Sequence, residues 1–341
     1  MNRRTFLKNS LSVSLAVVMS PQLIASSKKV SGRYIMTVDG KIDAGDFGLI
    51  LPHEHVMSNF GQEPSYIGQY NTSGLMQQVV PYLKKVKGLG CDALVECTTA
   101  YFGRNVQLLK EISSASGLTI ITNTGWYAAA NDRYVPDKAY RLTADEIAQI
   151  WIDEWRDGID DTEVKPGFIK LAVDDGPVSA IDKKLVRAGA KTHRKTGLVM
   201  QVHTSNNPKA ATLQLETIKN EGVHPSAWIW THAHNVPEPT PLIEAAKEGA
   251  WISLDGIRAD TKRQDHIFML LKALAAKGYQ RQILLSHDGD AYPSGRKIRP
   301  FHALMTEFFP RLKSEGFTEQ DLTQFTTLNP QDAFSVHIRK V

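Results

Sequence analysis

The feature that most restricts the fold is a regular alternation of short apolar runs with longer helix-like stretches after residue 46. Such alternation predicts parallel strand pairing, and runs that are apolar almost throughout are typical of strands covered by helices on both faces. Eight such units predict an α/β fold, a single closed (β/α)8 TIM barrel over residues 47–341. An open, doubly wound sheet is the alternative, because periodicity does not show whether the first and last strands pair. The predicted strands are residues 47–56, 92–99, 118–127, 167–174, 197–205, 226–235, 250–257 and 282–290.

Polar residues interrupt these runs near the carboxyl ends of the strands, the end that carries the chemistry in barrel enzymes. In the first strand, PHEHV, alternation of side chains directs His53 and His55 into the barrel mouth and Glu54 away from it. A lone histidine in such a place is more often a hydrogen-bonded core residue, but several at strand ends indicate a metal site. The candidate residues are His53, His55, Lys170, His203, His232 and Asp288.

The histidines and the aspartate have the chemistry of a catalytic metal site. Imidazole nitrogen binds zinc at ~2.0–2.1 Å, and a barrel mouth brings His203 and His232 close to the first histidine pair. Asp288 supplies a carboxylate that can bind metal and accept a proton from metal-bound water, whose pKa falls to ~7. The pattern therefore predicts a metal site in which Asp288 can act as a metal ligand and as a catalytic proton acceptor.

Lys170 cannot bind a cation as an ammonium group, because it has three donors and no lone pair. Beside divalent cations its pKa should fall, and the free amine can add carbon dioxide. The product, N6-carboxylysine, is a carbamate that can bridge two ions. The alternative is a lysine paired with Asp174 or Asp175.

The first 25 residues have the pattern of a secretory signal. A basic start, MNRRTFLKNS, precedes the apolar LSVSLAVVM, and no acidic residue occurs before Asp39. Adjacent Arg3 and Arg4 resemble the twin-arginine signal, so we expect the twin-arginine export machinery as a partner and a periplasmic location. The apolar run is too short to span ~30 Å of hydrocarbon, which argues against stable membrane association, the alternative being an N-terminal anchor. We expect residues 26–46 to form a lead-in that is either irregular or a hairpin turned at Asp39-Gly40.

The charge balance favours a small-molecule substrate over nucleic acid. Loss of residues 1–25 would leave 37 basic and 36 acidic residues, with no basic stripe. The two cysteines, Cys91 and Cys97, would lie ~20 Å apart along one strand, so we expect free buried thiols. The oligomeric state stays open, a homodimer included.

Five segments together resemble the phosphotriesterase family of the amidohydrolase superfamily: HEH, GFIKLAV, QVHT, THAHN and LLSHD. The similarity runs from about residue 32 to the end and includes GRNVQLLKEIS and TTLNPQDAFS. It implies a (β/α)8 barrel with two divalent ions, usually Zn2+, bridged by a carbamylated lysine and a hydroxide that attacks a phosphoryl or carbonyl centre. By position it implies that one ion is bound by His53, His55 and Asp288, the other by His203 and His232, and both by Lys170.

Departures from the family bear on the substrate. Phosphotriesterases have a relay histidine and an acid where this chain has Gly256 and Asn235, which argues against efficient organophosphate hydrolysis. Lactonases have an arginine at the place of Gly256, and here Arg258 follows two residues later. Tyr127 matches a tyrosine that lines the lactonase pocket, which favours a lactone or carboxylic ester.

The sequence thus predicts a binuclear metal-dependent hydrolase of a small ester-like substrate: a lactone, carboxylic ester or phosphoester. An amidase acting on an acylated amine with the same site is the main alternative. A non-catalytic exported binding protein is disfavoured, because all six metal positions are filled. Tyr292, Arg258 and Arg296 lie in predicted loops where substrate contacts usually arise, and His234 and His287 are expected to have supporting or structural roles.

Overall fold

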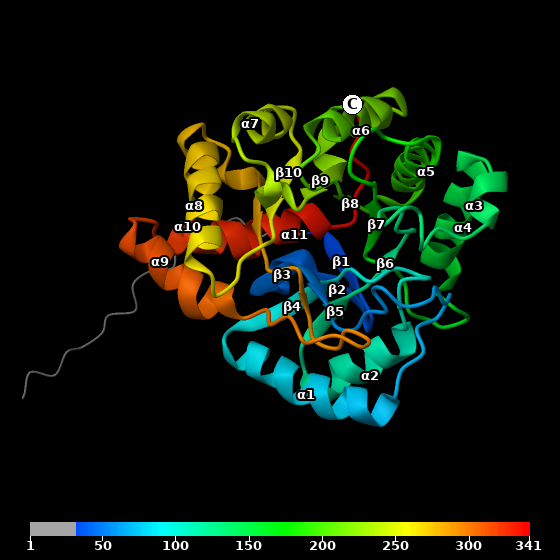
Figure 1. Cartoon of the computed structure of the whole chain (residues 1–341), viewed down its shortest axis with the longest axis horizontal. Helices are drawn as coiled ribbons and strands as arrows, with labels where there is room; N and C mark the ends of the chain where they lie inside the picture. Colours follow the sequence, from blue (N-terminus) through cyan, green and yellow to red (C-terminus); the bar gives the residue numbers. More distant parts are fainter. Residues whose placement is uncertain (1–31) are drawn as a thin grey trace, which may run out of the picture.

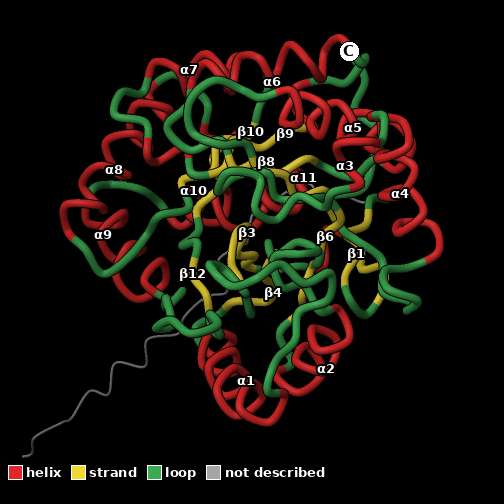
Figure 2. The backbone as a smooth tube through the Cα atoms, turned by 45° about the vertical axis from the view of Figure 1, so that its right-hand side comes forward, coloured by secondary structure: helices red, strands yellow, loops and turns green. Residues whose placement is uncertain are grey.

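The protein is described by a computed structural model over residues 32–341, in which a ring of parallel strands is surrounded by helices (Figure 1, Figure 2). The barrel strands are β3 (Leu49–His55), β4 (Cys91–Glu96), β5 (Thr119–Ile121) with β6 (Asn123–Thr124), β7 (Phe168–Ala172), β8 (Met200–His203), β9 (Trp228–Thr231), β10 (Trp251–Leu254), and β11 (Ile283–Leu285) with β12 (Gly289–Asp290). The predicted signal, residues 1–25, lies outside the described residues. No helix within residues 32–341 has the length and apolarity needed to cross a membrane.

Pairing between the first and last barrel strands closes the ring. One sheet runs β11-β10-β9-β8-β7-β6 and the other β12-β3-β4-β5. The sheets join because β5 and β6 are consecutive parts of the third barrel strand, as β11 and β12 are of the eighth. β12 pairs with β3 in parallel, with Gly289 opposite Glu54 and Asp290 opposite His55. This pairing confirms the closed (β/α)8 barrel and rules out the open sheet.

Helices connect successive strands, and their ends follow local sequence signals. α4 and α5 each begin with a capping box, in which Thr143 and Ser179 bond reciprocally with Glu146 and Asp182. α5 ends at Gly197, whose φ of 77° is the left-handed conformation that favours glycine. The helices are α1 (Thr72–Gly88), α2 (Val106–Ser116), α3 (Lys138–Arg141), α4 (Ala144–Asp157), α5 (Ala180–Thr196), α6 (Pro208–Asn220), α7 (Thr240–Lys247), α8 (Thr261–Ala276), α9 (Phe309–Ser314), α10 (Glu319–Thr323) and α11 (Asn329–Phe334).

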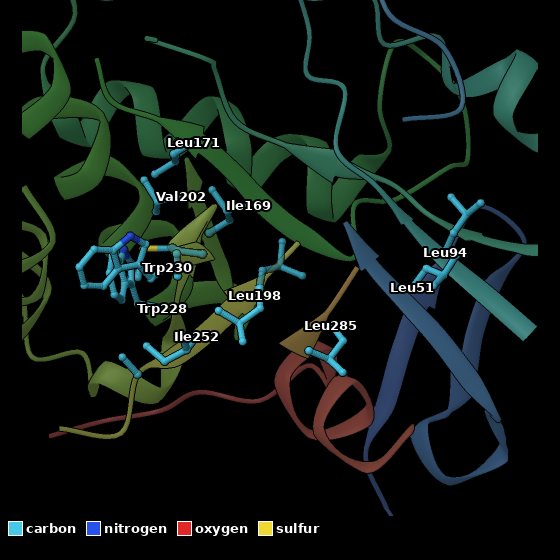
Figure 3. Packing of buried hydrophobic residues seen from close by; sticks show 14 of the residues in the cluster. Leu51, Leu94, Ile169, Leu171, Leu198, Val202, Trp228, Trp230, Ile252 and Leu285 are labelled. Carbon is cyan, nitrogen blue, oxygen red and sulfur yellow. The ribbon is translucent and has the colours of Figure 1, made fainter. Parts of the chain in front are cut away.

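The apolar core has two layers. The outer layer lies between strands and helices and includes Leu94, Leu171 and Trp228 (Figure 3). The inner layer fills the barrel with buried side chains such as Val95 and Ile229. This interior is therefore a packed core, and open space occurs at the strand ends, where function is expected.

A predicted hairpin packs against the inner core. β1 (Tyr34–Thr37) and β2 (Gly40–Asp43) are antiparallel, and Thr37 lies opposite Gly40, so the turn is at Val38-Asp39, one residue before the predicted position. Ile35 from β1 and Phe334 from α11 belong to the inner core, and the rings of Phe334 and Phe168 meet edge to face at 5.6 Å. Because Phe168 begins β7, these residues cover the amino ends of the strands.

An irregularity in β3 directs its histidines. Leu51 pairs with Leu94 and Glu54 with Glu96, so β3 has one residue more than β4 between these pairs. An extra residue resets the alternation of side chains. Ile50 can therefore lie in the inner core while His53, three residues later, also faces the barrel interior.

The covering of the barrel bottom makes a stability prediction. Phe334 is 1% exposed, and Phe334→Ala should lower the free energy of unfolding by about 3–5 kcal/mol because it leaves a cavity in the inner core. Ile338→Ala is the control, since Ile338 is 44% exposed and its truncation should change this energy by about 0.5 kcal/mol. Urea unfolding measures both; equal midpoints for the two variants would contradict the assigned packing.

Candidate metal centre

A cavity of about 140 Å³ lies at the carboxyl ends of the barrel strands and brings together all six residues predicted to bind metal. Its histidines come from β3, β8 and the residue after β9, its lysine from β7, and its aspartate from between β11 and β12. Aromatic side chains and one arginine complete the wall. The lining residues are His53, His55, Phe60, Phe102, Tyr127, Lys170, His203, His232, Asp288 and Arg299.

The donor atoms lie at distances suited to shared cations. Asp288 Oδ1 is 3.6 Å from His53 Nε2 and 3.5 Å from His55 Nε2. One donor atom each from His53, His232 and Asp288 lie within 4.8 Å of one another, and the rings of His203 and His232 are 4.5 Å apart. With bonds of ~2.0–2.2 Å to each ligand, imidazole and carboxylate donors at these separations can converge on divalent ions after small side-chain adjustments.

Lys170 is the unusual member of the group. It is 1% exposed, and its Nζ has no hydrogen-bond partner within the described chain. The predicted alternative, an ion pair with Asp174 or Asp175, does not occur among residues 32–341, and Asp174 accepts a hydrogen bond from Asn131 N instead. Burial of an ammonium group without a partner is strongly unfavourable, which distinguishes Lys170 from an ordinary surface lysine.

Asp255 was not selected from the sequence, but its carboxylate contacts the Nδ1 atoms of two of the cavity histidines. It follows β10 and is fully buried. Its carboxylate lies 2.7 Å from His53 Nδ1 and 3.0 Å from His232 Nδ1, and it accepts from His232 N at 3.0 Å. The available signal was a lone acid at the end of an apolar strand, in ISLD.

The charge of Asp255 determines how the histidines present their nitrogens. Burial alone would raise the pKa of Asp255, but His232 and His53 outweigh it and hold the pKa well below its usual range. Burial lowers the pKa of His53 to about 3, so its ring is neutral. A carboxylate only accepts, so Nδ1 of His53 and of His232 carries a proton, and Nε2 of the neutral His53 ring keeps its lone pair for the cavity.

His55 is oriented in the same way by a hydroxyl group. Its Nδ1 is 2.8 Å from Thr98 Oγ1, and that hydroxyl donates its only proton to Met57 O at 2.7 Å. His55 Nδ1 must therefore be the donor. Its Nε2 faces Asp288 Oδ1 at 3.5 Å.

Glu54 joins the first strand to the loop that holds Asp288. Its Oε1 lies 2.6 Å from His287 Nδ1 and accepts from Ser286 Oγ at 2.7 Å, and its Oε2 accepts from Gly289 N at 2.7 Å. Between these contacts Asp288 has a φ of 52°, an unfavourable left-handed conformation for a residue other than glycine. Glu54 therefore fixes the backbone on both sides of Asp288.

The two additional histidines lie beside the lining and not in it. His287 Nε2 accepts from Leu304 N, opposite its contact with Glu54. His234 Nδ1 is 3.1 Å from Asp255 and its Nε2 lies 2.6 Å from Arg263 Nη2. Both rings thus connect buried carboxylates to neighbouring elements.

Gly256 stands where phosphotriesterases have the relay histidine, and this position has no room for a side chain. A Cβ atom on Gly256 would lie 2.2 Å from His234 Nε2 and 2.7 Å from Arg263 Nη2. The space above Gly256 is thus filled by the contact between His234 and Arg263. A histidine or arginine cannot occupy this position without displacing them.

Predicted substrate-pocket residues fall in different places. Tyr127 lines the cavity, stacks on Phe102 at 4.9 Å and places its Oη 3.2 Å from His203 Nδ1. Arg258 lies at the rim, 3.8 Å from Asp288 Oδ2. Tyr292, expected in a loop where substrate contacts arise, lines a separate groove.

Tyr292 is held away from the cavity by its neighbours. Its carbonyl accepts from Ser58 N, and its ring meets that of Tyr70 edge to face. Arg296 lines the same groove, with its guanidinium over the ring of Phe60. Sequence reasoning also missed the lining residues Phe60, Phe102 and Arg299, which loops bring to the cavity.

The chain is similar to several known proteins. A model of the Phosphotriesterase family matches residues 33–334. An aryldialkylphosphatase of Saccharolobus solfataricus is 25% identical, over 86% of this chain and 97% of that protein. An N-acetyltaurine hydrolase of Xenopus tropicalis is 21% identical, over 89% of this chain and 97% of that protein. The crystal structure of a mutant PTE-like lactonase of Deinococcus radiodurans is 26% identical and superposes with a TM-score of 0.79, over 88% of this chain and 99% of that one.

The role of Asp255 can be tested by metal binding. Asp255→Asn should weaken metal affinity about 10–100-fold, because an amide cannot accept from every donor that surrounds it. Competition with a chromophoric chelator measures the affinity. Asp265→Asn is the control, since Asp265 is an exposed residue of α8. Equal affinities in the two variants would show that Asp255 does not orient the histidines.

Proposed function

Because the chain belongs to the phosphotriesterase family and is a metal-dependent hydrolase, we propose that it cleaves a small ester-like substrate: a lactone, carboxylic ester or phosphoester. The observation that carries this proposal is the convergence of four histidines, an aspartate and an unpartnered buried lysine on one cavity. Mixed imidazole and carboxylate donors suit Zn2+, which we propose as the metal.

Six residues would hold two ions. His53, His55 and Asp288 would hold one, His203 and His232 the other, and Lys170 would connect them as N6-carboxylysine. The fit rests on Lys170 Nζ, because a carbamate at this buried and unpartnered atom would present oxygens to the cavity. When bound, the ions supply Lewis acidity, which polarises the scissile bond and lowers the pKa of water.

The protein's own side chains would position the substrate and move the proton. Asp288 directs Oδ1 toward His53 and His55, and Oδ2 toward the rim. With Gly256 in place of a relay histidine, Asp288 would take up a proton and release it toward solvent at the rim. The stacked rings of Phe102 and Tyr127 line the same cavity and would exclude water from it.

Two observations bear on the bond that is cleaved. Tyr127 lines the cavity, as the resemblance to lactonases implies, and a lactonase mutant is a structural neighbour, which favours a lactone or carboxylic ester. An acylated amine is the second candidate, because several relatives are N-acetyltaurine hydrolases. The same pair of ions can activate either carbonyl.

The basic, apolar character of residues 1–25 supports the further proposal of export to the periplasm by the twin-arginine machinery. The partner would be a small-molecule substrate, in keeping with a cavity of about 140 Å³. Neither nucleic acid nor a membrane surface is proposed as a partner.

The proposed function is tested by a substrate panel on metal-loaded protein. Lactones, aryl esters, phosphodiesters, phosphotriesters and acylated amines are assayed before and after removal of metal by a chelator. We expect hydrolysis of an ester or lactone that disappears with the metal and returns on addition of Zn2+. Full activity in a metal-free preparation would overturn the proposal.

The proposed modification has its own test. Lys170→Ala should lose both metal and activity, because the connecting group is removed, and acetate or propionate should restore part of the activity by filling the gap. Mass spectrometry of the intact wild-type protein and metal analysis measure the modification and the ions. Lys183→Ala is the control, since Lys183 is an exposed residue of α5. Unchanged metal content in Lys170→Ala would show that Lys170 does not connect the ions.

A further inference from the structure

Two arginines meet the outward oxygen of Asp288 at the rim of the cavity. Arg299 Nη1 lies 3.3 Å and Arg258 Nη2 3.8 Å from Asp288 Oδ2. Their side chains are 41% and 39% exposed, so both guanidinium groups also face solvent. Arg299 belongs to the lining of the metal cavity, and both arginines line an adjoining cavity of about 450 Å³.

We infer that the substrate carries an anionic group, a carboxylate, sulfonate or phosphate, which Arg258 and Arg299 hold while the scissile bond lies against the metal pair. This inference rests on the proposed function and names the class of substrate for the same site. Guanidinium groups bind such oxyanions through charge-assisted and often bidentate hydrogen bonds.

The charges at the rim of the cavity support the inference that the substrate supplies an anionic group to the two arginines. Within the described residues, Asp288 is the carboxylate with which both arginines pair. In the proposed function Asp288 is a metal ligand, so its charge is compensated by the ions. The arginines then need another anion, and the substrate can supply it.

Two further carboxylates line the outer cavity, but α8 already engages them. Asp260 Oδ1 caps the helix by accepting from Arg263 N at 3.1 Å. Glu307 Oε2 accepts a weak hydrogen bond from Gln264 Nε2 at 3.5 Å. Neither forms an ion pair with Arg258 or Arg299 within residues 32–341.

The backbone holds both arginines in place, although they lie in loops. Arg299 and Asp290 exchange two backbone hydrogen bonds of 2.8 and 2.9 Å. The carbonyl of Arg258 accepts from Asp260 N at 2.8 Å and from Gln264 Nε2 at 2.7 Å. Such anchoring lowers the entropy lost when an anion binds.

The sizes of the two cavities indicate how the substrate lies. The inner cavity of about 140 Å³ admits a small reacting group, and the outer one of about 450 Å³ admits a larger remainder. Arg299 lines both and so stands at their junction. The substrate is therefore a small ester or amide with its anionic group on the part that extends outward.

Matched acetate esters test this inference. 4-Acetoxybenzoate carries a carboxylate and 4-acetoxybenzamide does not, while the scissile bond is the same. Metal-loaded wild-type protein should hydrolyse the anionic ester with the higher kcat/KM. In the double variant Arg258→Gln, Arg299→Gln, the ratio of kcat/KM for the anionic to the neutral ester should fall about tenfold, as expected for losing charge-assisted hydrogen bonds at a partly exposed site. Arg281→Gln is the control, because Arg281 is an exposed residue that precedes the amino end of β11, away from the carboxyl ends where the rim lies, and it should leave the ratio as in wild type.

Binding without turnover is the second measurement. Calorimetry on metal-loaded wild-type protein should show that 4-hydroxybenzoate binds more tightly than 4-hydroxybenzamide. In the double variant the affinity for 4-hydroxybenzoate should fall about tenfold, while the affinity for 4-hydroxybenzamide should stay the same. Metal analysis must show equal metal content in all proteins. The inference would be overturned if wild type and the double variant had equal ester ratios and equal affinities for 4-hydroxybenzoate. Hydrolysis of the esters would still support the proposed function in that case.

If the double variant does not fold, Arg299→Lys replaces it. We expect this variant to lose less affinity for 4-hydroxybenzoate, and an unchanged affinity would count against the inference. Absence of hydrolysis of every ester in the panel would count against the proposed function instead, and the benzoate affinities would still decide the role of the arginines.

Discussion

Two buried carboxylates, Glu54 and Asp255, hold the candidate metal centre in shape. Asp288 and His232 have φ angles of 52° and 59°, and such left-handed backbone costs roughly 1–3 kcal/mol per residue when the side chain is not glycine. Glu54 binds the residues on both sides of Asp288, and Asp255 binds the backbone and ring of His232. Each strained position is thus stabilised by a fully buried acceptor, which lets both side chains point into the cavity.

Closure of the barrel and assembly of the site depend on the same contacts. β3 and β12, which close the barrel, pair through Glu54 and Gly289. The Glu54 side chain accepts hydrogen bonds from Ser286 and Gly289 across this seam between the first and last strands. His53 and His55 stand on one side of this seam and Asp288 on the other. An error in strand register would move the aspartate away from the histidines, so the fold and the site are stabilised together.

Local patterns predicted much of the fold and the site. Strand and helix periodicity indicated the eight units, and interruption of apolar runs by charged or imidazole side chains indicated six residues of the cavity. The supporting contacts could not be predicted, because Asp255 meets His53 across 202 residues and Glu54 meets His287 across 233. Phe102 and Arg299 were missed because loop conformation, which has no periodic signal, decides where they point, and it also decides that Tyr292 lines a separate groove.

The region around Gly256 separates this rim from that of phosphotriesterases and lactonases. Arg263 donates to Gly256 O and to His234 Nε2, so the place of a relay histidine or lactonase arginine is occupied from α8. Positive charge at the rim comes instead from Arg258 and Arg299, which face Asp288 Oδ2. Strands position most of the proposed metal ligands, whereas loops position Arg258 and Arg299. In the proposed function the metal ligands can therefore stay the same while the groups at the rim differ.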